Sequence, residues 1–233
     1  MNISHALREQ LRSKGASIVG YADLSEIPEQ DRKGYRYGIL IAVALNPEIV
    51  PKIAKGPNLE YYHEYRRVNN MLNELAEYAS TILKSKGFDA LPKTQSIVKI
   101  DQSTKRTELP HKTVATRAGI GWIGKCALLV TEEYGAAIRI SSVLTNADLD
   151  VGAPINNARC GSCTDCQNIC PASAVSGKNW EIKMDRDEFF KALHCRDKIH
   201  ERGVNLGLTE ATCGLCIWAC PWTQRYLKKS KVL

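Results

Sequence analysis

Apolar residues in the first 90 positions recur with periods that predict both helices and strands. A spacing of three to four residues predicts a short helix over residues 2–13 and a long helix over residues 59–86, which Gly87 is placed to end. A short apolar segment at residues 17–21 predicts a strand. The continuous apolar run at residues 37–45 predicts a second strand, covered on both faces.

The middle of the chain continues this mixture of elements. Residues 96–100, 126–131 and 136–144 have the apolar character of strands, and residues 111–118 predict a helix that stops at Gly119. Helices and strands follow one another in no simple alternation. We therefore assign this part of the chain to the α+β class.

The composition changes near residue 150. Asp, Asn, Gly and Pro accumulate from Asp148 onward, and a dense group of cysteines follows. Such polar, turn-forming segments are typical of domain boundaries. We expect one domain over residues 1–150 and a smaller one over residues 151–233.

The cysteines are concentrated in the second of these domains. Residues 1–125 contain none, whereas eight of the nine lie between Cys160 and Cys220. The N-terminus shows no apolar leader, and no apolar run is long enough for a transmembrane helix. We therefore expect a cytoplasmic protein with no membrane partner, in which crowded cysteines bind metal rather than form disulfides.

The first cysteine motif is Cys160-x2-Cys163-x2-Cys166-x3-Cys170, followed directly by proline. This spacing is typical of bacterial ferredoxins with two 4Fe–4S clusters. The first three thiolates bind one cluster and the fourth binds the other. The pattern predicts that Cys170 begins a helix that leads away from the first cluster.

The second motif, Cys213-x2-Cys216-x3-Cys220, repeats the last three positions of the first, and Cys195 is the nearby candidate for the missing ligand. Exchange of the fourth cysteines gives an explicit assignment. Cluster one takes Cys160, Cys163, Cys166 and Cys220, and cluster two takes Cys170, Cys195, Cys213 and Cys216.

Four-thiolate zinc is the alternative metal, but the long first motif and the displaced fourth ligand favour iron–sulfur clusters. The ninth cysteine, Cys126, reads as a buried inert thiol rather than a reactive one. We expect Trp180, Trp218 and Trp222 to cover the clusters and limit access of solvent.

A glycine-rich segment occupies residues 119–125. It matches GxGxxG and nearly matches GxxxxGK[ST], yet both nucleotide motifs need a strand before the loop and a helix after it. Here the predicted order is reversed, which argues against a phosphate site. Two explanations stay open for the glycines, namely close approach to a large flat ligand and a tight buried turn. His111, just before the segment, could be a ligand, an acid–base group or a helix cap.

The net charge of +7 favours either simple solubility or attraction to an acidic partner protein or RNA. The cationic residues are spread along the chain, apart from Lys228, Lys229 and Lys231. That group alone is weak evidence for nucleic-acid binding.

Three stretches together carry a family resemblance: HKTVATRAGIGWIGKCALLV at 111–130, RCGSCTDCQNICPASAV at 159–175 and CGLCIWACPW at 213–222. With SKGASIVGYADLSEIPE at 13–29, they resemble the epoxyqueuosine reductase family over essentially the whole chain. The resemblance implies a nitroreductase-like, cobalamin-binding N-terminal domain. A ferredoxin-like domain with two 4Fe–4S clusters would follow and pass electrons to the cobalt.

The resemblance also implies roles for residues around the glycine segment. The residues expected beside the corrin, as cofactor-binding residues, are His111, Gly119, Gly121, Trp122, Gly124 and Lys125. Longer family members carry a catalytic acid just before this segment. The candidates here are Asp101 and His111, with Glu108 as an alternative to Asp101.

The function implied by the resemblance is a cobalamin-dependent reductase, supplied with electrons by a ferredoxin or flavodoxin. Family members remove the epoxide oxygen from a modified tRNA base, and the longer ones hold tRNA with a helical-repeat extension. In this sequence thirteen residues follow Cys220, so a small electrophile is an alternative substrate. The alternative function is a non-enzymatic electron-transfer protein or an activator that reduces a corrinoid.

Overall fold

A computed structural model describes residues 2–204, 206–208 and 212–232 and divides the chain into two compact units. Unit 1 comprises Met1–Val43, Val68–Ile120 and Arg139–Ile155. Unit 2 comprises Ala44–Arg67, Gly121–Ile138 and Asn156–Leu233. Each unit is therefore assembled from three separate stretches of the chain.

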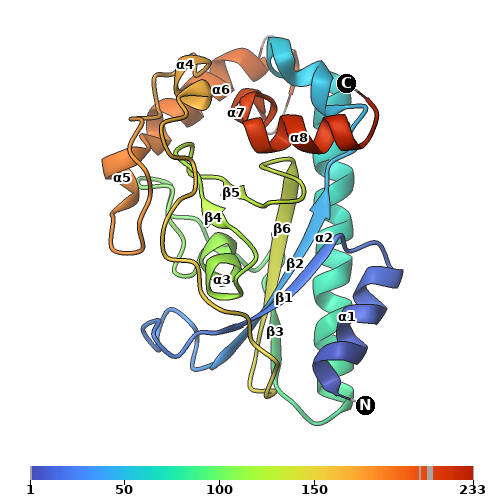
Figure 1. Ribbon diagram of the computed structural model, residues 1–233. Helices are drawn as coiled ribbons and strands as arrows, with labels where there is room; N and C mark the ends of the chain where they lie inside the picture. Colours follow the sequence, from blue (N-terminus) through green and yellow to red (C-terminus); the bar gives the residue numbers. More distant parts are fainter. Residues whose placement is uncertain (1, 205, 209–211, 233) are drawn as a thin grey trace. The chain divides into compact units, whose positions relative to one another are not determined.

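Unit 1 is built on a sheet of four strands, whose order in space differs from their order in the chain (Figure 1). In spatial order its strands are β1 (Ile18–Asp23), β2 (Tyr37–Ala44), β6 (Ile138–Thr145) and β3 (Ala90–Pro92). β1 pairs antiparallel with β2, and β3 pairs antiparallel with β6. The expected mixture of helix and sheet is confirmed.

Strand β2 lies in the middle of the apolar core. Ile39, Leu40 and Ile41 are fully buried, although successive side chains of a strand point to opposite faces. Both faces of β2 are therefore covered, as its continuous apolar sequence predicts. Removal of each such side chain from water contributes about 1.5–3 kcal/mol to folding.

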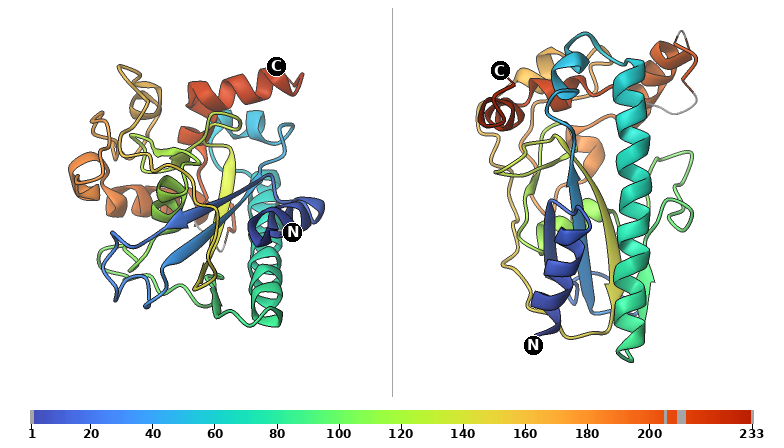
Figure 2. Two further views of the ribbon diagram at one scale, coloured as in Figure 1. Left: turned by 60° about the horizontal axis from the view of Figure 1, so that its bottom comes forward. Right: turned by 90° about the vertical axis from the view of Figure 1, so that its right-hand side faces the viewer.

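Two helices predicted from their periodicity flank this sheet. Helix α1 (Ile3–Ser13) begins where the side chain of Asn2 accepts a hydrogen bond from the Ser4 backbone N–H. Helix α2 (Leu59–Ser85) is followed by a turn at Gly87, whose φ of 85° suits a glycine. Figure 2 shows α1 beside the part of α2 that belongs to unit 1. None of the described helices combines the length and apolarity that crossing a bilayer requires.

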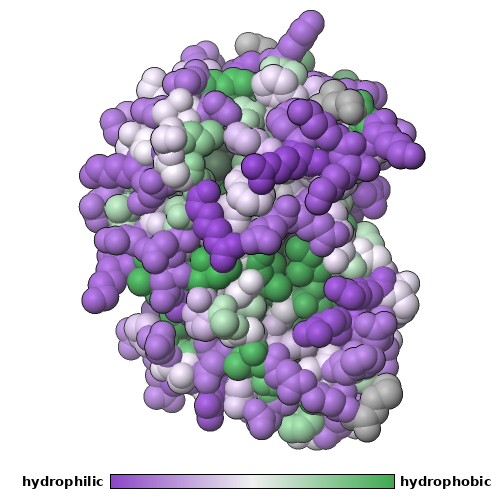
Figure 3. All heavy atoms as spheres, viewed as in Figure 1, coloured by the Kyte–Doolittle hydropathy of each residue, from purple (hydrophilic) through white to green (hydrophobic). Residues whose placement is uncertain are grey.

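Unit 2 contains short elements. They are the 3-10 helix η1 (Val50–Lys55), the hairpin of β4 (Trp122–Ile123) and β5 (Leu129–Val130), and the helices α4 (Asp165–Asn168), α5 (Arg186–Phe189), α6 (Ala192–Val204), α7 (Leu215–Ala219) and α8 (Pro221–Lys229). The start of α2 also belongs to this unit. On the face shown in Figure 3, hydrophilic side chains gather over α8, which carries the exposed Lys228 and Lys229.

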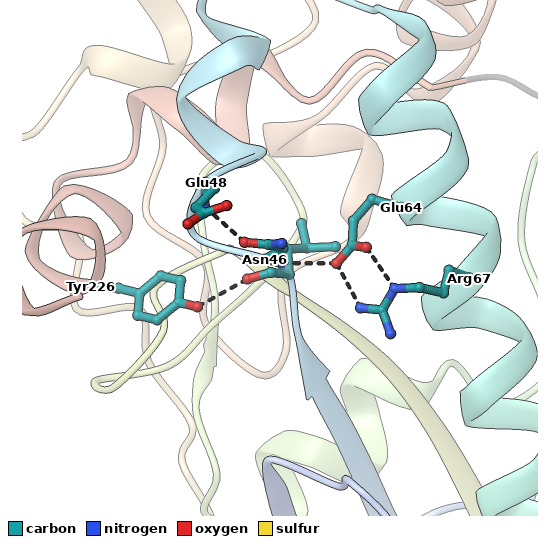
Figure 4. A network of polar contacts seen from close by, with 6 residues as sticks. Asn46, Glu48, Glu64, Arg67 and Tyr226 are labelled. Carbon is teal, nitrogen blue, oxygen red and sulfur yellow. Dashed lines mark hydrogen bonds and ion pairs between the residues drawn. The ribbon is translucent and has the colours of Figure 1, made fainter. Parts of the chain in front are cut away.

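A buried carboxylate ties the first segment of unit 2 together (Figure 4). Glu64 is 4% exposed and accepts hydrogen bonds from the Asn46 backbone N–H, at 2.9 Å, and from Arg67, at 2.8 Å. Burial by itself would raise the pKa of Glu64, but these hydrogen bonds hold that pKa below its usual range. Nearby, the Tyr226 hydroxyl of α8 donates to the Leu45 carbonyl at 2.9 Å.

Two strand predictions need correction. Residues 96–100 form no strand; the backbone N–H of Ile97 closes a turn onto the Thr94 carbonyl, and the side chains of Ile97 and Ile100 are exposed. The third strand of the sheet is instead the shorter segment 90–92, which has too few residues to show a period. In the predicted strand 126–131, only Leu129 and Val130 belong to β5.

Candidate iron–sulfur site and its surroundings

The first cysteine motif surrounds the short helix α4. The Cys163 N–H donates to the Cys160 carbonyl at 3.1 Å, which makes a tight turn before the helix. Cys170 follows α4 and does not begin a helix, so that prediction is wrong. The reason lies at Ser173, whose φ of 46° prevents a helix from continuing after the proline at 171.

The second motif forms α7 and leads directly into α8. Gly214 precedes α7 with a φ of 78°, and a Cβ at this position would lie 2.5 Å from the Ile53 side chain, so only glycine fits. Cys220 caps the N-terminus of α8, and Pro221 occupies the first turn, where its missing N–H costs nothing.

The exchanged cysteines have neighbours in the opposite motif. Burial raises the pKa of Cys220, and the nearby thiols of Cys160 and Cys166 act in the same direction. Burial, with the nearby thiols of Cys170 and Cys213, raises the pKa of Cys195 to about 12. Cys220 therefore lies with the first motif, and Cys195 lies with one cysteine from each motif.

A hollow in unit 2 adds to this picture. It has a volume of about 510 Å³ and is lined by α4, α7 and α8 through Asp165, Asn168, Ile169, Trp218, Ala219 and Gln224. Ile169 directly precedes Cys170, and Ala219 directly precedes Cys220. Cys170 and Cys220, the two ligands assigned to the cluster of the other motif, are thus each preceded in the chain by a residue that lines this hollow.

The thiols fit a pair of iron–sulfur clusters in their chemistry. All nine cysteines are free of disulfides, and the eight assigned as cluster ligands are only partly buried. Within residues 2–204, 206–208 and 212–232, no three His, Cys, Asp or Glu side chains converge on a single ion-sized position. A cubane needs a wider arrangement, because each cysteine binds a different iron.

The glycine-rich segment is packed against protein atoms. A Cβ at Gly119, whose φ is 70°, would lie 2.4 Å from the Ala153 carbonyl oxygen. A Cβ at Gly121 would lie 2.2 Å from the Val130 carbonyl oxygen, and one at Gly124 would lie 2.9 Å from the Val130 side chain. Backbone atoms of the chain itself therefore lie close to Gly119 and Gly121, and a side chain lies close to Gly124.

Trp122, which follows Gly121, lies within unit 2. Trp122 is fully buried, with its ring 5.0 Å from that of Trp222. Its indole N–H has no hydrogen-bond acceptor among the described residues, which leaves a buried donor available to a bound group. Trp180 is buried as expected, whereas Trp218 and Trp222 are only partly so.

Lys125 and Cys126 contact the cysteine motifs themselves. Lys125 is 4% exposed, and its ammonium group donates to the Cys163 carbonyl at 2.8 Å. The buried Cys126 thiol is within hydrogen-bonding reach of both Cys166 and Cys216. No spacing rule connects residue 125 with residue 163, so this contact could not be found from the sequence.

His111, the candidate common to both sets of site residues, belongs to a polar cluster in unit 1. Its Nδ1 lies 2.9 Å from the Ser142 hydroxyl. Burial, with the charges of Lys93 and Arg139, lowers the pKa of His111 to about 3, so the imidazole is neutral at physiological pH.

No sequence pattern pointed to Lys93 as a site residue. This residue is buried, and its ammonium group donates to the Leu109 carbonyl. Burial lowers the pKa of Lys93 to about 8. A lysine with this pKa can exchange a proton near neutral pH, which makes it a candidate acid–base group.

The remaining acid–base candidates are exposed. Asp101 lies in a turn where its carboxylate accepts hydrogen bonds from Ser103 and Thr104, and these bonds lower the pKa of Asp101 to about 2. Glu108 forms an ion pair with Lys33 on the surface. The structure therefore places the Asp101 carboxylate within its own turn.

Comparison with known proteins identifies similar sequences. Residues 159–223 match the family model of the 4Fe-4S double cluster binding domain. The chain is 29% identical over 126 residues to the epoxyqueuosine reductase of Synechocystis sp. and 35% identical over 118 residues to that of Lactococcus garvieae. These matches cover 53% and 51% of this chain and 43% and 29% of the two relatives, so the chain spans less than half of their length.

Solved structures share the fold over nearly the whole chain. The epoxyqueuosine reductase of Streptococcus thermophilus superposes with a TM-score of 0.62 at 20% identity, covering 96% of this chain and 67% of that one. An epoxyqueuosine reductase with an epoxyqueuosine-modified tRNA stem loop gives 0.60 at 20% identity, covering 94% and 65%. A reductive dehalogenase described in terms of B12-dependent dehalogenation gives 0.67 at 17% identity, covering 96% and 33%.

Proposed function

We propose that this chain, which is similar in sequence to epoxyqueuosine reductases, is an iron–sulfur reductase with two 4Fe–4S clusters and a cobalamin. The observation that carries the proposal is the neighbourhood of the exchanged cysteines. Cys220 lies with Cys160 and Cys166, and Cys195 lies with Cys170 and Cys213. Two separate stretches thus offer ligands to each other's cluster, as in two-cluster ferredoxins.

The proposed ligands are those expected from the motifs. Cluster one is held by Cys160, Cys163, Cys166 and Cys220, and cluster two by Cys170, Cys195, Cys213 and Cys216. When bound, the clusters supply one-electron transfer and cobalamin supplies a reducing cobalt centre. The match of residues 159–223 to a double-cluster domain supports the first part. The B12-dependent dehalogenase with the same fold supports the second.

The chain's own residues supply structure and protons. The glycine segment stays packed because a side chain at Gly119 or Gly121 would collide with backbone carbonyls. Lys93 can release a proton near neutral pH, since burial lowers its pKa to about 8. Asp101 and His111 stay predictions as catalytic residues, and His111, Gly119, Gly121, Trp122, Gly124 and Lys125 stay predictions as the residues around cobalamin.

We propose epoxyqueuosine in tRNA as the substrate, with another small electrophile as the alternative. The epoxyqueuosine reductases among the sequence relatives, and the complex with a modified tRNA stem loop, support the first choice. The proposed electron donor is a ferredoxin or flavodoxin. We further propose a nitroreductase-like N-terminal domain over residues 1–150, a ferredoxin-like domain over residues 151–233, and a cytoplasmic location, where free thiols persist.

The cofactors can be tested without a substrate. Protein purified and handled without oxygen is expected to hold about eight irons and eight sulfides per chain, from two cubanes. On addition of cobalamin, the visible spectrum of the bound corrin should differ from that of the free one. Zinc in place of iron would refute the proposal, and full iron content with no bound cobalamin would leave only an electron carrier.

The reaction is tested with reduced donor protein and two substrates. We expect conversion of an epoxyqueuosine-modified stem loop that depends on added cobalamin. Binding of that stem loop should weaken as salt rises, because phosphate contacts release counterions. Conversion of a free epoxide but not of the stem loop would select the small-molecule alternative. Failure to convert either would reject the reductase.

A further inference from the structure

Lys125 is a buried cation beside the first cysteine motif. Its side chain is 4% exposed, and its ammonium group donates to the backbone carbonyl of Cys163 at 2.8 Å. Its charge also acts on the thiol of Cys166. Both cysteines belong to the ligand set of cluster one, so the cation lies against that cluster's binding loop.

The turn that carries Lys125 is fixed by short-range contacts. The Gly124 N–H donates to the Leu128 carbonyl and the Ala127 N–H donates to the Gly124 carbonyl, both at 2.8 Å. Ala127 adopts a φ of 58°, which closes the turn. The next residue, Cys126, reaches a cysteine of each cluster. Lys125 is therefore held in place by the backbone on both sides.

The charged side chains near the cysteines of cluster one and of cluster two differ in how deeply they are buried. Asp165 is the acidic neighbour of Cys163, but it is exposed and therefore screened by water. On the side of cluster two, Arg202 acts on Cys213 and is only partly buried. A charge shielded from water acts more strongly than an exposed one at the same distance.

We propose that Lys125 holds cluster one at a higher reduction potential than cluster two. The inference rests on the two clusters of the proposed function. An added electron makes a cluster more negative, and a nearby buried cation stabilises that charge. The donor is oxidised by one electron and cluster one is reduced by one, with no bond made or broken. The first electron to enter the protein then resides on cluster one.

The test is a redox titration followed by electron paramagnetic resonance, with Lys125→Met as the main variant. Iron and sulfide are expected to match the wild type, while one of the two midpoint potentials falls and the other changes less. Lys125→Arg keeps the charge and should restore the potential. Lys229→Met removes the same charge from an exposed position of α8 and should leave both potentials unchanged.

The identity of the shifted cluster is tested in a Cys213→Ala background, which is expected to retain cluster one alone. There, Lys125→Met should lower the single remaining potential. If Lys125→Met alone loses iron, Lys125→Gln keeps a donor for the Cys163 carbonyl without the charge. Wild-type potentials in an iron-complete Met or Gln variant would overturn the inference, and so would loss of iron in both.

The outcome also separates this inference from the proposed function. Full iron content with unshifted potentials would reject the role of Lys125 and leave the two clusters in place. Absence of iron from the wild-type protein would reject the clusters, and the inference with them.

Discussion

The two units differ in what can hold them together. Unit 1 contains no cysteine, and its sheet buries fully covered residues such as Ile39 and Ile41 in an apolar core. All nine cysteines belong to unit 2, where α4, α5 and α7 have only four, four and five residues. Isolated helices of this length are unstable in water. The contrast suggests that apolar burial stabilises unit 1, whereas bound clusters contribute much of the stability of unit 2.

The largest effect is expected when one proposed ligand is removed from unit 2. We predict that Cys213→Ala loses cluster two, so that iron falls from about eight to about four per chain. Hydrogen exchange should then rise around α6 and α7 and stay unchanged in β1 and β2. Iron analysis and exchange measured by mass spectrometry provide the test.

The Cys213→Ala variant can also contradict the proposed difference between the two units. In the proposed assignment cluster two takes Cys170 from the first motif, so loss of Cys213 should not release Cys160 or Cys163 from cluster one. Loss of all iron would mean that the clusters are not separable. Equal loss of protection in both units would mean that they do not differ in what stabilises them.

The sequence predicted those parts of the molecule in which one strong pattern decides the structure. The continuous apolar run at residues 37–45 forms β2, and the long segment with apolar residues every three to four positions forms α2. Each is long enough for burial to be visible in the pattern. The matched double-cluster domain likewise covers the cysteine motifs that the spacing identified.

Contacts between distant segments could not be predicted in this way. Residues 96–100 have the apolar character of a strand, yet Ile97 and Ile100 are exposed, and the sheet uses residues 90–92 instead. The hydrogen bond from Lys125 to the Cys163 carbonyl joins two residues that are 38 positions apart in the chain. Burial of Lys93 depends on tertiary packing as well. No local period carries information about such contacts.

A change in the core of unit 1 should give the next largest effect. Ile41→Ala removes a fully buried side chain from β2 and is expected to lower the free energy of unfolding by about 2–5 kcal/mol. Iron content should stay at the wild-type level, because unit 1 contributes no cysteine. Urea unfolding followed by circular dichroism measures the loss. The exposed Ile97→Ala is the control, with a change within about 0.5 kcal/mol.

A smaller effect should follow from the pH dependence of His111. Its pKa is about 3 in the folded protein, against about 6.5 in an unfolded chain, so below pH 6.5 only the unfolded state gains the proton. Stability is therefore complete above pH 6.5 and is lost as the pH falls toward 3. Lys93 and Arg139 face the ring and oppose its protonation, while Ser142 lies at Nδ1.

The expected loss between about pH 7 and about pH 5.5 is about 1 kcal/mol. Urea unfolding at the two pH values measures it, and His111→Gln should remove this part of the pH dependence. A variant with the full wild-type dependence would assign the effect to other groups.

The smallest effect is expected at the one cysteine that the ligand assignment leaves out. Cys126 reaches Cys166 and Cys216, so it lies where either cluster could recruit it. Eight thiolates already complete two cubanes, however, and Cys126→Ser keeps the size and a hydrogen-bond donor. Iron and sulfide should therefore stay unchanged in Cys126→Ser, while Cys216→Ser loses a cluster as the matched control. If Cys126→Ser lost four irons instead, Cys126 would be a ligand and one of the eight assigned cysteines would not.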